Sequence, residues 1–304
     1  MSASNHQPPA ASEEGPPPVT PWRQVWLRFR RQPLGMASAV FLLLLSAIAL
    51  VFFIFSLAEV PWPADPNATN LEAKLQPPGP QHLLGTDNLG RDVLSRILHG
   101  TYISLTIGLV AVAVSISIGV VVGAIAGYVG GWLDNLLMRI VDAIMCFPAF
   151  FLILTVIALL GPGILKIVVV IGLVAWTGTA RLVRAEFLTL RESEYVKAAQ
   201  ALGQRHSKII FRHILPNGMA PIFVAAVLGV PDAILTEAGL SFLGIGVQPP
   251  QPTWGNIIAD GKTYILDAWW LIVFPGVAIL LTALSFYLAG ESLREAMQTK
   301  TERK

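Results

Sequence analysis

The chain alternates between long apolar segments and shorter polar ones. Six of the apolar segments are long enough to cross a membrane as helices, and they cover residues 34–58, 103–127, 139–160, 164–182, 218–240 and 269–290. A helix needs about 20 mainly apolar residues to cross the hydrocarbon core of a bilayer. The pattern therefore predicts an all-α integral membrane protein with six membrane-spanning helices.

Composition supports this class. Of the 304 residues 54% are hydrophobic and only 13% are charged, whereas soluble domains carry about 25% charged residues. The formal net charge of +2 is too small to indicate a nucleic-acid partner. Cys146 is the single cysteine and lies in an apolar run, so we expect it to pack against neighbours and to form no disulfide within the chain.

Two polar regions flank the first predicted span. Residues 1–33 begin with a Pro-rich tail, which we expect to be disordered, and end in a basic, aromatic segment suited to lipid headgroups at the cytoplasmic surface. Residues 59–102 form a polar outer segment. In it we predict a turn, a helix capped by Asp87 and an apolar edge from Val93 and Ile97. This amphipathic helix either lies beside the bundle or contacts a ligand.

The second and third spans have features of helix packing. In the second, small residues recur every fourth position and leave one face almost without side chains, at Ser115, Gly119, Gly123 and Gly127. Such faces let two helices approach closely, here inside the bundle or, less favoured, against a partner subunit. In the third, Arg139 and Asp142 are spaced to pair near the interface, and Pro148 is expected to kink the helix.

The fifth span carries acidic groups. Pro231 precedes Asp232, and Glu237 follows within the same apolar run. Acidic residues inside a span usually face a protein interior or a water-filled cavity. Asp232 and Glu237 therefore either line a pathway or have a structural role, such as binding backbone amides freed near Pro231.

A basic polar loop, residues 181–217, separates the fourth and fifth spans. We predict a short helix capped by Ser193, with Tyr195, Ala199 and Leu202 on one apolar stripe and Gly203 at its end. A second short basic helix is expected to end before Pro216. The small pair 198–199 on an exposed turn would let another surface approach the backbone.

The distribution of positive charge predicts the orientation. The outer segments hold only Lys74, Arg91, Arg96, Lys166 and Lys262, and the other 16 of the 21 Lys and Arg residues fall in the inner segments. Cytoplasmic segments carry the excess of positive residues. We therefore expect the loop 181–217, both termini and the charged tail 291–304 on the cytoplasmic side.

Three motifs carry a family resemblance. Ala-Ala, three residues, Gly, ten residues and Ile-Leu-Pro in the loop 181–217 resemble the cytoplasmic "EAA" loop of ABC importer permeases. The Gly-Thr-Asp, Gly-Arg-Asp-Val and Ser-Arg pattern within 85–96 and the sequence of 248–255 resemble the C-type permease subunits of the dipeptide, oligopeptide and nickel systems. The resemblance covers most of the chain and implies a type I ABC importer fold.

In that family the loop is a coupling helix that docks into the ATPase subunit. The resemblance assigns this role to Glu194, Tyr195, Lys197, Ala198, Ala199, Leu202, Gly203, Ile214 and Pro216. Lys197 stands where the family often has Glu, so the resemblance does not carry over a salt bridge from that position. The alternative is a generic amphipathic loop on the membrane surface.

The resemblance also implies partners. These are a homologous second permease, two ABC ATPase subunits that bind ATP and magnesium, an extracytoplasmic substrate-binding protein and membrane lipid. The sequence has no phosphate-binding loop, no His/Cys/Asp/Glu set at metal-ligand spacing and no nucleophile elbow. We therefore predict a non-enzymatic transporter subunit without catalytic residues, metal or cofactor of its own.

Substrate and compartment follow from the resemblance as expectations. Peptides are the favoured substrate, and nickel or another small solute is the alternative; the absence of histidine from the predicted spans counts slightly for peptides. An ion-driven secondary transporter or a membrane enzyme is a less favoured class. The expected location is the bacterial cytoplasmic (inner) membrane.

Overall fold

The computed structural model describes residues 21–297, and the predicted disordered tail and the last residues of the charged C-terminal segment lie outside this range. The described part is helical and contains no named strand. Its helices are α1 (Pro21–Phe29), α2 (Pro33–Leu57), α3 (Val93–Val129), α4 (Gly131–Met145), α5 (Ala149–Leu160), α6 (Ile164–Arg191), α7 (Glu194–Ala201), α8 (His206–Ile209), α9 (Leu215–Asn217), α10 (Met219–Phe242), α11 (Trp254–Gly261) and α12 (Trp270–Met297).

The predicted all-α membrane fold is confirmed. In the described range α2, α3, α6, α10 and α12 are each long and apolar enough to cross a membrane, and α4 with α5 makes a sixth span when the two are counted together. That pair bends by 81° at the break before Pro148. A proline disfavours the helical conformation of the residue before it, so the predicted kink is a full break.

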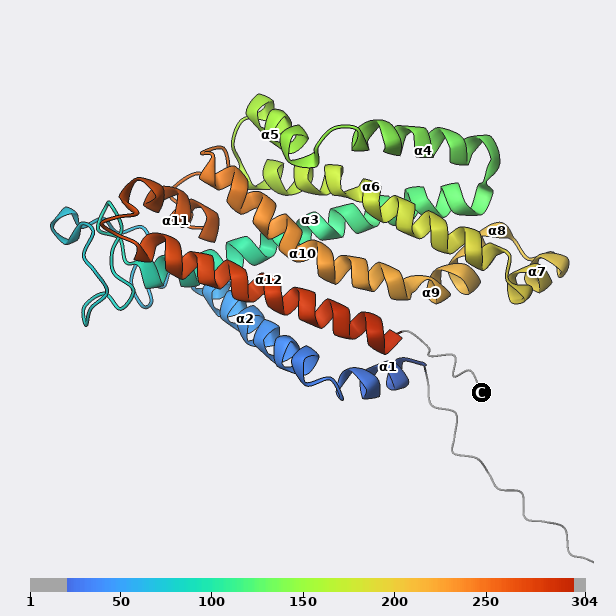
Figure 1. The fold of residues 1–304 in the computed structure, drawn as a ribbon, viewed down its shortest axis with the longest axis horizontal. Coiled ribbons are helices and arrows are strands. Elements are labelled where there is room, and N and C mark those ends of the chain that lie inside the picture. Colours follow the sequence, from blue (N-terminus) through green and yellow to red (C-terminus); the bar gives the residue numbers. More distant parts are fainter. Residues whose placement is uncertain (1–20, 298–304) are drawn as a thin grey trace, which may run out of the picture.

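Asp142 does not pair with Arg139 as predicted. Its carboxylate accepts a hydrogen bond from Arg181 of α6. The pairing expected within one helix is replaced by a contact between helices because α6 runs beside α4 (Figure 1).

The predicted amphipathic helix of the outer segment is the first part of α3, which runs without interruption from Val93 to Val129. Asp92, and not Asp87, caps it, because Asp92 Oδ1 accepts a hydrogen bond from the Ser95 amide at 2.8 Å. His99 thus lies on a spanning helix. It precedes the predicted span 103–127, so the expectation that the spans contain no histidine stays a prediction.

The helices form a bundle around the long pair α3 and α6 (Figure 1). The small-residue face of α3 lies against α6, where a Cβ added at Gly119 would come within 2.5 Å of Thr179 Cβ and one at Gly127 within 2.7 Å of the Arg184 carbonyl oxygen. α10 packs on α3 and α12, and α2 packs on the same two helices. The small residues on the α3 face allow its close contact with α6.

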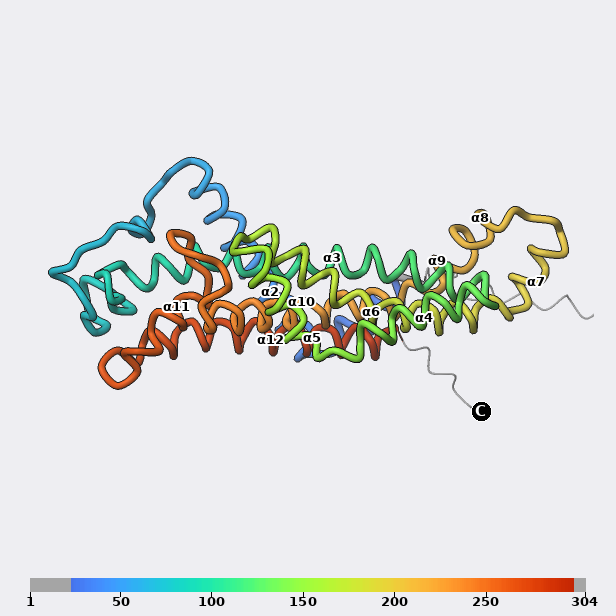
Figure 2. The backbone as a smooth tube through the Cα atoms, turned by 90° about the horizontal axis from the view of Figure 1, so that it is seen from above, coloured from blue at the N-terminus to red at the C-terminus, as the bar shows by residue number. Residues whose placement is uncertain are grey.

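The bundle has two different ends. Residues 59–92 and α11 gather at one end, and α7, α8 and α9 gather at the other, where α7 projects beyond the end of α3 (Figures 1 and 2). α6 and α12 are longer than predicted, extending to Arg191 and Met297. The loop between α6 and α10 is therefore carried on helices that project past the apolar segments.

Candidate functional site

The loop between α6 and α10 folds onto its own apolar core. Two residues of α7 and two from the following helical turns lie beneath the surface and pack against α6 and α10. The members of this cluster are Val183, Phe187, Val196, Ala199, Ile209, Ile214 and Ile222. Because each of these side chains is at most 4% exposed, the loop is packed against the ends of the two spans.

Several large apolar side chains of the loop are exposed. Leu202 is 80% exposed, Phe211 69% and Tyr195 41%. Ala198 is also exposed, whereas Ala199 is buried at 4%. The predicted accessible Ala-Ala pair is therefore split: only Ala198 leaves room for another surface, and Ala199 holds α7 to the core.

Tyr195, Leu202 and Phe211 are large apolar side chains that are exposed beside this packed core. We call Tyr195, Ala198, Leu202 and Phe211 the loop surface. Phe211 was not among the predicted site residues, because a lone aromatic in a basic segment carries no distinguishing pattern. Val196, which anchors α7, was also missed, since the predicted apolar stripe ran through Tyr195, Ala199 and Leu202; of those three only Ala199 is buried.

Several contacts fix the shape of the loop. Gly203 has φ +70°, a conformation that favours glycine, and it ends the first helix as predicted. His213 Nε2 and Gln204 Oε1 are 3.0 Å apart, joining the turn after α7 to the next helical segment. Tyr128 Oη and His206 Nδ1 are 2.7 Å apart, which ties α8 to the end of α3.

Two details of the loop differ from prediction. Ser193 does not cap α7 with its side chain, because its hydroxyl donates to the Leu190 carbonyl at 2.6 Å. The second helix does not end before Pro216: a π-helical turn, η2 (Ile210–Ile214), leads directly into α9, and Pro216 lies in the first turn of α9. Proline is tolerated there because the amide it lacks has no partner in a first turn.

Charged groups at the base of the loop are paired. Lys197 Nζ lies 3.3 Å from Glu192, and this hydrogen bond lowers the pKa of the exposed Glu192 carboxyl. Arg184 Nη2 donates to Asp134 of α4 at 2.7 Å, and Arg191 Nη1 donates to the Tyr128 carbonyl at 3.1 Å. Lys197, at the position where the family resemblance expects Glu, thus makes an exposed ion pair inside the loop, of a kind that contributes little to stability.

The two acids of α10 have different surroundings. Glu237 is 1% exposed, and it accepts hydrogen bonds from Ser241 Oγ at 2.7 Å and Thr253 Oγ1 at 3.1 Å. Asp232 is exposed and accepts a hydrogen bond from Tyr287 of α12 at 2.6 Å. The partners recorded for both carboxylates are side-chain hydroxyls, and not the freed backbone amides suggested by the sequence.

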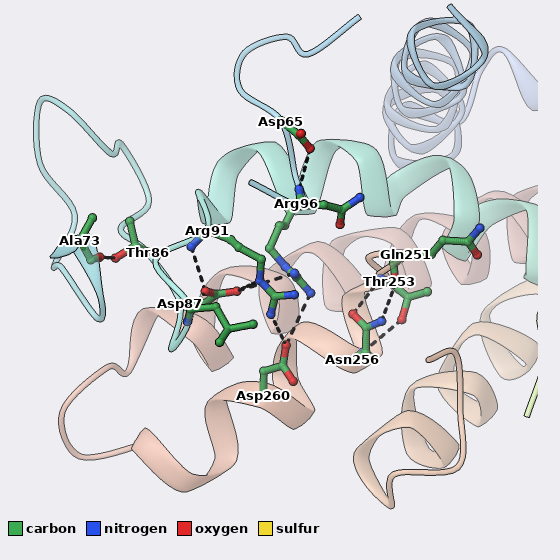
Figure 3. Close-up of polar contacts among 12 residues, drawn as sticks. Asp65, Ala73, Thr86, Asp87, Arg91, Arg96, Gln251, Thr253, Asn256 and Asp260 are labelled. Carbon is green, nitrogen blue, oxygen red and sulfur yellow. Dashed lines mark hydrogen bonds and ion pairs between the residues drawn. The ribbon is translucent and has the colours of Figure 1, made fainter. Parts of the chain in front are cut away.

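At the opposite end, the remaining motif residues form a buried ionic cluster (Figure 3). Arg91 Nε lies 2.6 Å from Asp87 and its Nη2 3.0 Å from Asp260 of α11, while Arg96 lies 3.7 Å and 3.5 Å from the same two carboxylates. Burial raises the pKa of the Asp260 carboxyl, and the two arginines oppose this shift. The cluster joins the segment before α3 to α11.

The same end is held by a capping box on α11. Thr253 Oγ1 accepts from the Asn256 amide at 3.1 Å, and Asn256 Oδ1 accepts from the Thr253 amide at 2.9 Å (Figure 3). Among residues 21–297, no group of three or more His, Cys, Asp or Glu side chains lies close enough together to hold a metal ion.

Comparison with known proteins identifies the family. The profile of the family described as "binding-protein-dependent transport system inner membrane component" matches residues 119–302, and that of the "N-terminal TM domain of oligopeptide transport permease C" matches residues 20–78. The chain belongs to the ABC importer permeases of this family. The resemblance inferred from the three motifs is confirmed.

Named relatives of the permease are similar over most of its length. It is 38% identical over 305 residues to a dipeptide transport system permease protein, DppC, of Alkalihalophilus pseudofirmus, covering 98% of both chains. It is 40% identical over 281 residues to a glutathione transport system permease protein, GsiD, of Pectobacterium atrosepticum, covering 92% of both. A putative peptide transport system permease protein of Brucella suis is 42% identical over 255 residues, 83% of this chain and 86% of the relative.

A solved structure supports the fold. An inward-facing form of the MetNI methionine ABC transporter contains a chain that superposes with a TM-score of 0.55 at 18% identity, covering 68% of the permease and 98% of that chain. This confirms the type I importer fold of a multi-pass membrane protein. The order of elements, with a packed loop between α6 and α10, follows from that fold.

Proposed function

We propose that this permease is the C-type subunit of an ATP-driven importer of peptides in the bacterial cytoplasmic membrane. Its relatives are named as permease proteins of peptide, dipeptide and glutathione transport systems. ATP is bound and hydrolysed in two partner ATPase subunits, a second permease completes the pathway, and a substrate-binding protein delivers the peptide on the outer side. Both termini and the loop 181–217 lie on the cytoplasmic side in this arrangement.

The loop surface is the observation that carries the proposal. An exposed apolar patch on a loop with its own packed core can transmit force, because displacement of the patch displaces α6 and α10 with it. Docking of Tyr195, Ala198, Leu202 and Phe211 in an ATPase groove would couple closure of the ATPase dimer to movement of the spans. Transport is then alternating access between inward- and outward-facing states.

The first experiment is purification of the tagged chain in mild detergent from its native membranes, followed by identification of the co-purifying subunits. We expect two kinds of partner, a second permease and ATPase subunits. Ala198→Arg places a long cation in the exposed contact and should remove the ATPases while keeping the second permease. Ala68→Arg, at another exposed alanine in the outer segment, is the matched control and should keep both. Ala199 is unsuitable because it is buried.

Uptake tests the energy source and the substrate. The purified complex with its binding protein, in sealed vesicles, should accumulate radiolabelled dialanine only with ATP on the cytoplasmic side. The Ala198→Arg complex should show none. Uptake that follows a proton or sodium gradient without ATP, or recovery of the chain alone as a homo-oligomer, would replace the proposal by a secondary transporter.

A further inference from the structure

Two polar side chains meet on the outward faces of α10 and α12. Tyr287 Oη donates to Asp232 Oδ1 at 2.6 Å, and both side chains are exposed in this chain. Asp232 lies ten residues before Phe242 at the outer end of α10, a distance of about 15 Å along a helix. The pair is therefore well inside an apolar span and away from both ends of it.

A carboxylate at this depth is not expected to face lipid. Charged groups in a span are costly and usually face a protein interior or a water-filled cavity. A carboxylate has about four acceptor positions, and the Tyr287 hydroxyl occupies one of them. Asp232 thus has capacity for a further donor.

Glu237, on the same helix, is an acidic residue with a structural role. It is buried at 1%, and its contacts to Ser241 and Thr253 join α10 to the start of α11. Asp232 is exposed, and the hydrogen bond that its carboxylate accepts within the described residues comes from Tyr287, which is itself 41% exposed. The contrast separates an acid that holds the fold together from one that is presented to something outside the chain.

We propose that Asp232, oriented by Tyr287, binds the ammonium group of the transported peptide on the translocation pathway. This rests on the proposed peptide substrate. The α-amino group has a pKa of about 8, so it is mainly protonated at neutral pH, and a charge-assisted hydrogen bond to a carboxylate suits it. Every unmodified linear peptide carries this group, so a single carboxylate serves peptides with different side chains.

Accessibility tests the site without a substrate. Cys146 is the only cysteine, so Cys146→Ser gives a cysteine-free background. Leu235, 46% exposed, is three residues from Asp232 and so on the same side of α10. In the complete complex, Leu235→Cys should react with small methanethiosulfonates, and faster with a trimethylammonium reagent than with a sulfonate reagent. Asp232→Asn should abolish this charge preference.

A matched control and a contrary result are available. Leu44→Cys on α2 is also exposed in this chain, at 60%, but carries no neighbouring acid, and it should stay unreactive in the membrane. If Leu235→Cys is as unreactive as Leu44→Cys, the face is covered by lipid or by the second permease, and the proposal is wrong. Reaction of Leu235→Cys without a charge preference overturns it equally.

Protection identifies the ligand. Dialanine should slow the modification of Leu235→Cys, and N-acetyl-dialanine, which lacks the ammonium group, should not. Asp232→Asn should raise the half-protecting dialanine concentration by about tenfold or more, since it removes a hydrogen bond to a charged group; Tyr287→Phe should raise it less. Equal protection by both compounds, or none in a complex that imports dialanine, contradicts the site. A wild-type complex that imports no dialanine contradicts the proposed substrate instead.

Discussion

At the scale of single residues, side chains of the same or similar type have different surroundings only a few positions apart. Ala198 is exposed and Ala199 lies in an apolar core, and Asp232 is exposed where Glu237 is enclosed by hydroxyl groups. One turn of a helix is enough to change which side of the element a side chain occupies. The assignment of such neighbours therefore depends on what packs against each face.

Glu237 gives a prediction at this scale. Glu237→Ala would leave the hydroxyls of Ser241 and Thr253 without their buried acceptor, and each unsatisfied group costs about 1–3 kcal/mol. We expect a lower thermal unfolding midpoint in detergent and less protein in the membrane. Glu237→Gln keeps an acceptor oxygen and should be milder. Normal stability with altered transport would instead mark Glu237 as a pathway residue.

At the scale of elements, the contact between α3 and α6 depends on glycine. A Cβ at Gly123 would meet the Ala180 carbonyl oxygen at 2.5 Å and Val183 Cβ at 2.7 Å. Real Cβ atoms do not approach this closely, so any side chain at Gly123 must push α3 and α6 apart. Gly178 lies on α6 with nothing within 4 Å of its added Cβ.

These two glycines form a matched pair for a stability measurement. Gly123→Ala should destabilise the protein by about 1–3 kcal/mol through overpacking. Gly178→Ala should be neutral or stabilise by up to about 1 kcal/mol, because alanine reduces the freedom of the unfolded chain. Thermal unfolding of both variants in the same detergent compares them directly. An equal effect at the two positions would show that the α3–α6 contact does not limit stability.

At the scale of the whole molecule, the two ends are built for different tasks. The end with residues 59–92 and α11 is held by the Asp87, Arg91, Arg96 and Asp260 cluster, and the other end presents the loop surface. The excess of positive residues predicts that the second end is cytoplasmic. Basic residues there also have structural contacts, as Arg184 has with Asp134.

Orientation can be measured with single cysteines. In the Cys146→Ser background, Ala68→Cys and Ser207→Cys are exposed positions at opposite ends. A membrane-impermeant maleimide added to cells with a permeable outer envelope should label Ala68→Cys, and should label Ser207→Cys only after the membrane is opened with detergent. The reverse result would show the opposite topology, in which the loop surface lies on the outer side, away from the proposed ATPase subunits.

The sequence by itself determined the class of protein, the number of spans, the family and the position of the loop between α6 and α10. Apolar length, charge distribution and short motifs are local properties, and each is set by residues close together in the chain. For the same reason Gly203 could be identified as a helix end, since a left-handed residue is needed there whatever surrounds it.

Tertiary structure alone decided which side chains are presented and which are enclosed. The burial of Ala199 and the pairing of Asp142 with Arg181 both depend on neighbours distant in sequence. Helical periodicity gives the angle between two side chains around the helix axis, but it does not tell which of the two side chains faces the core. That direction is set by the helix that packs alongside, and it separates Glu237 from Asp232.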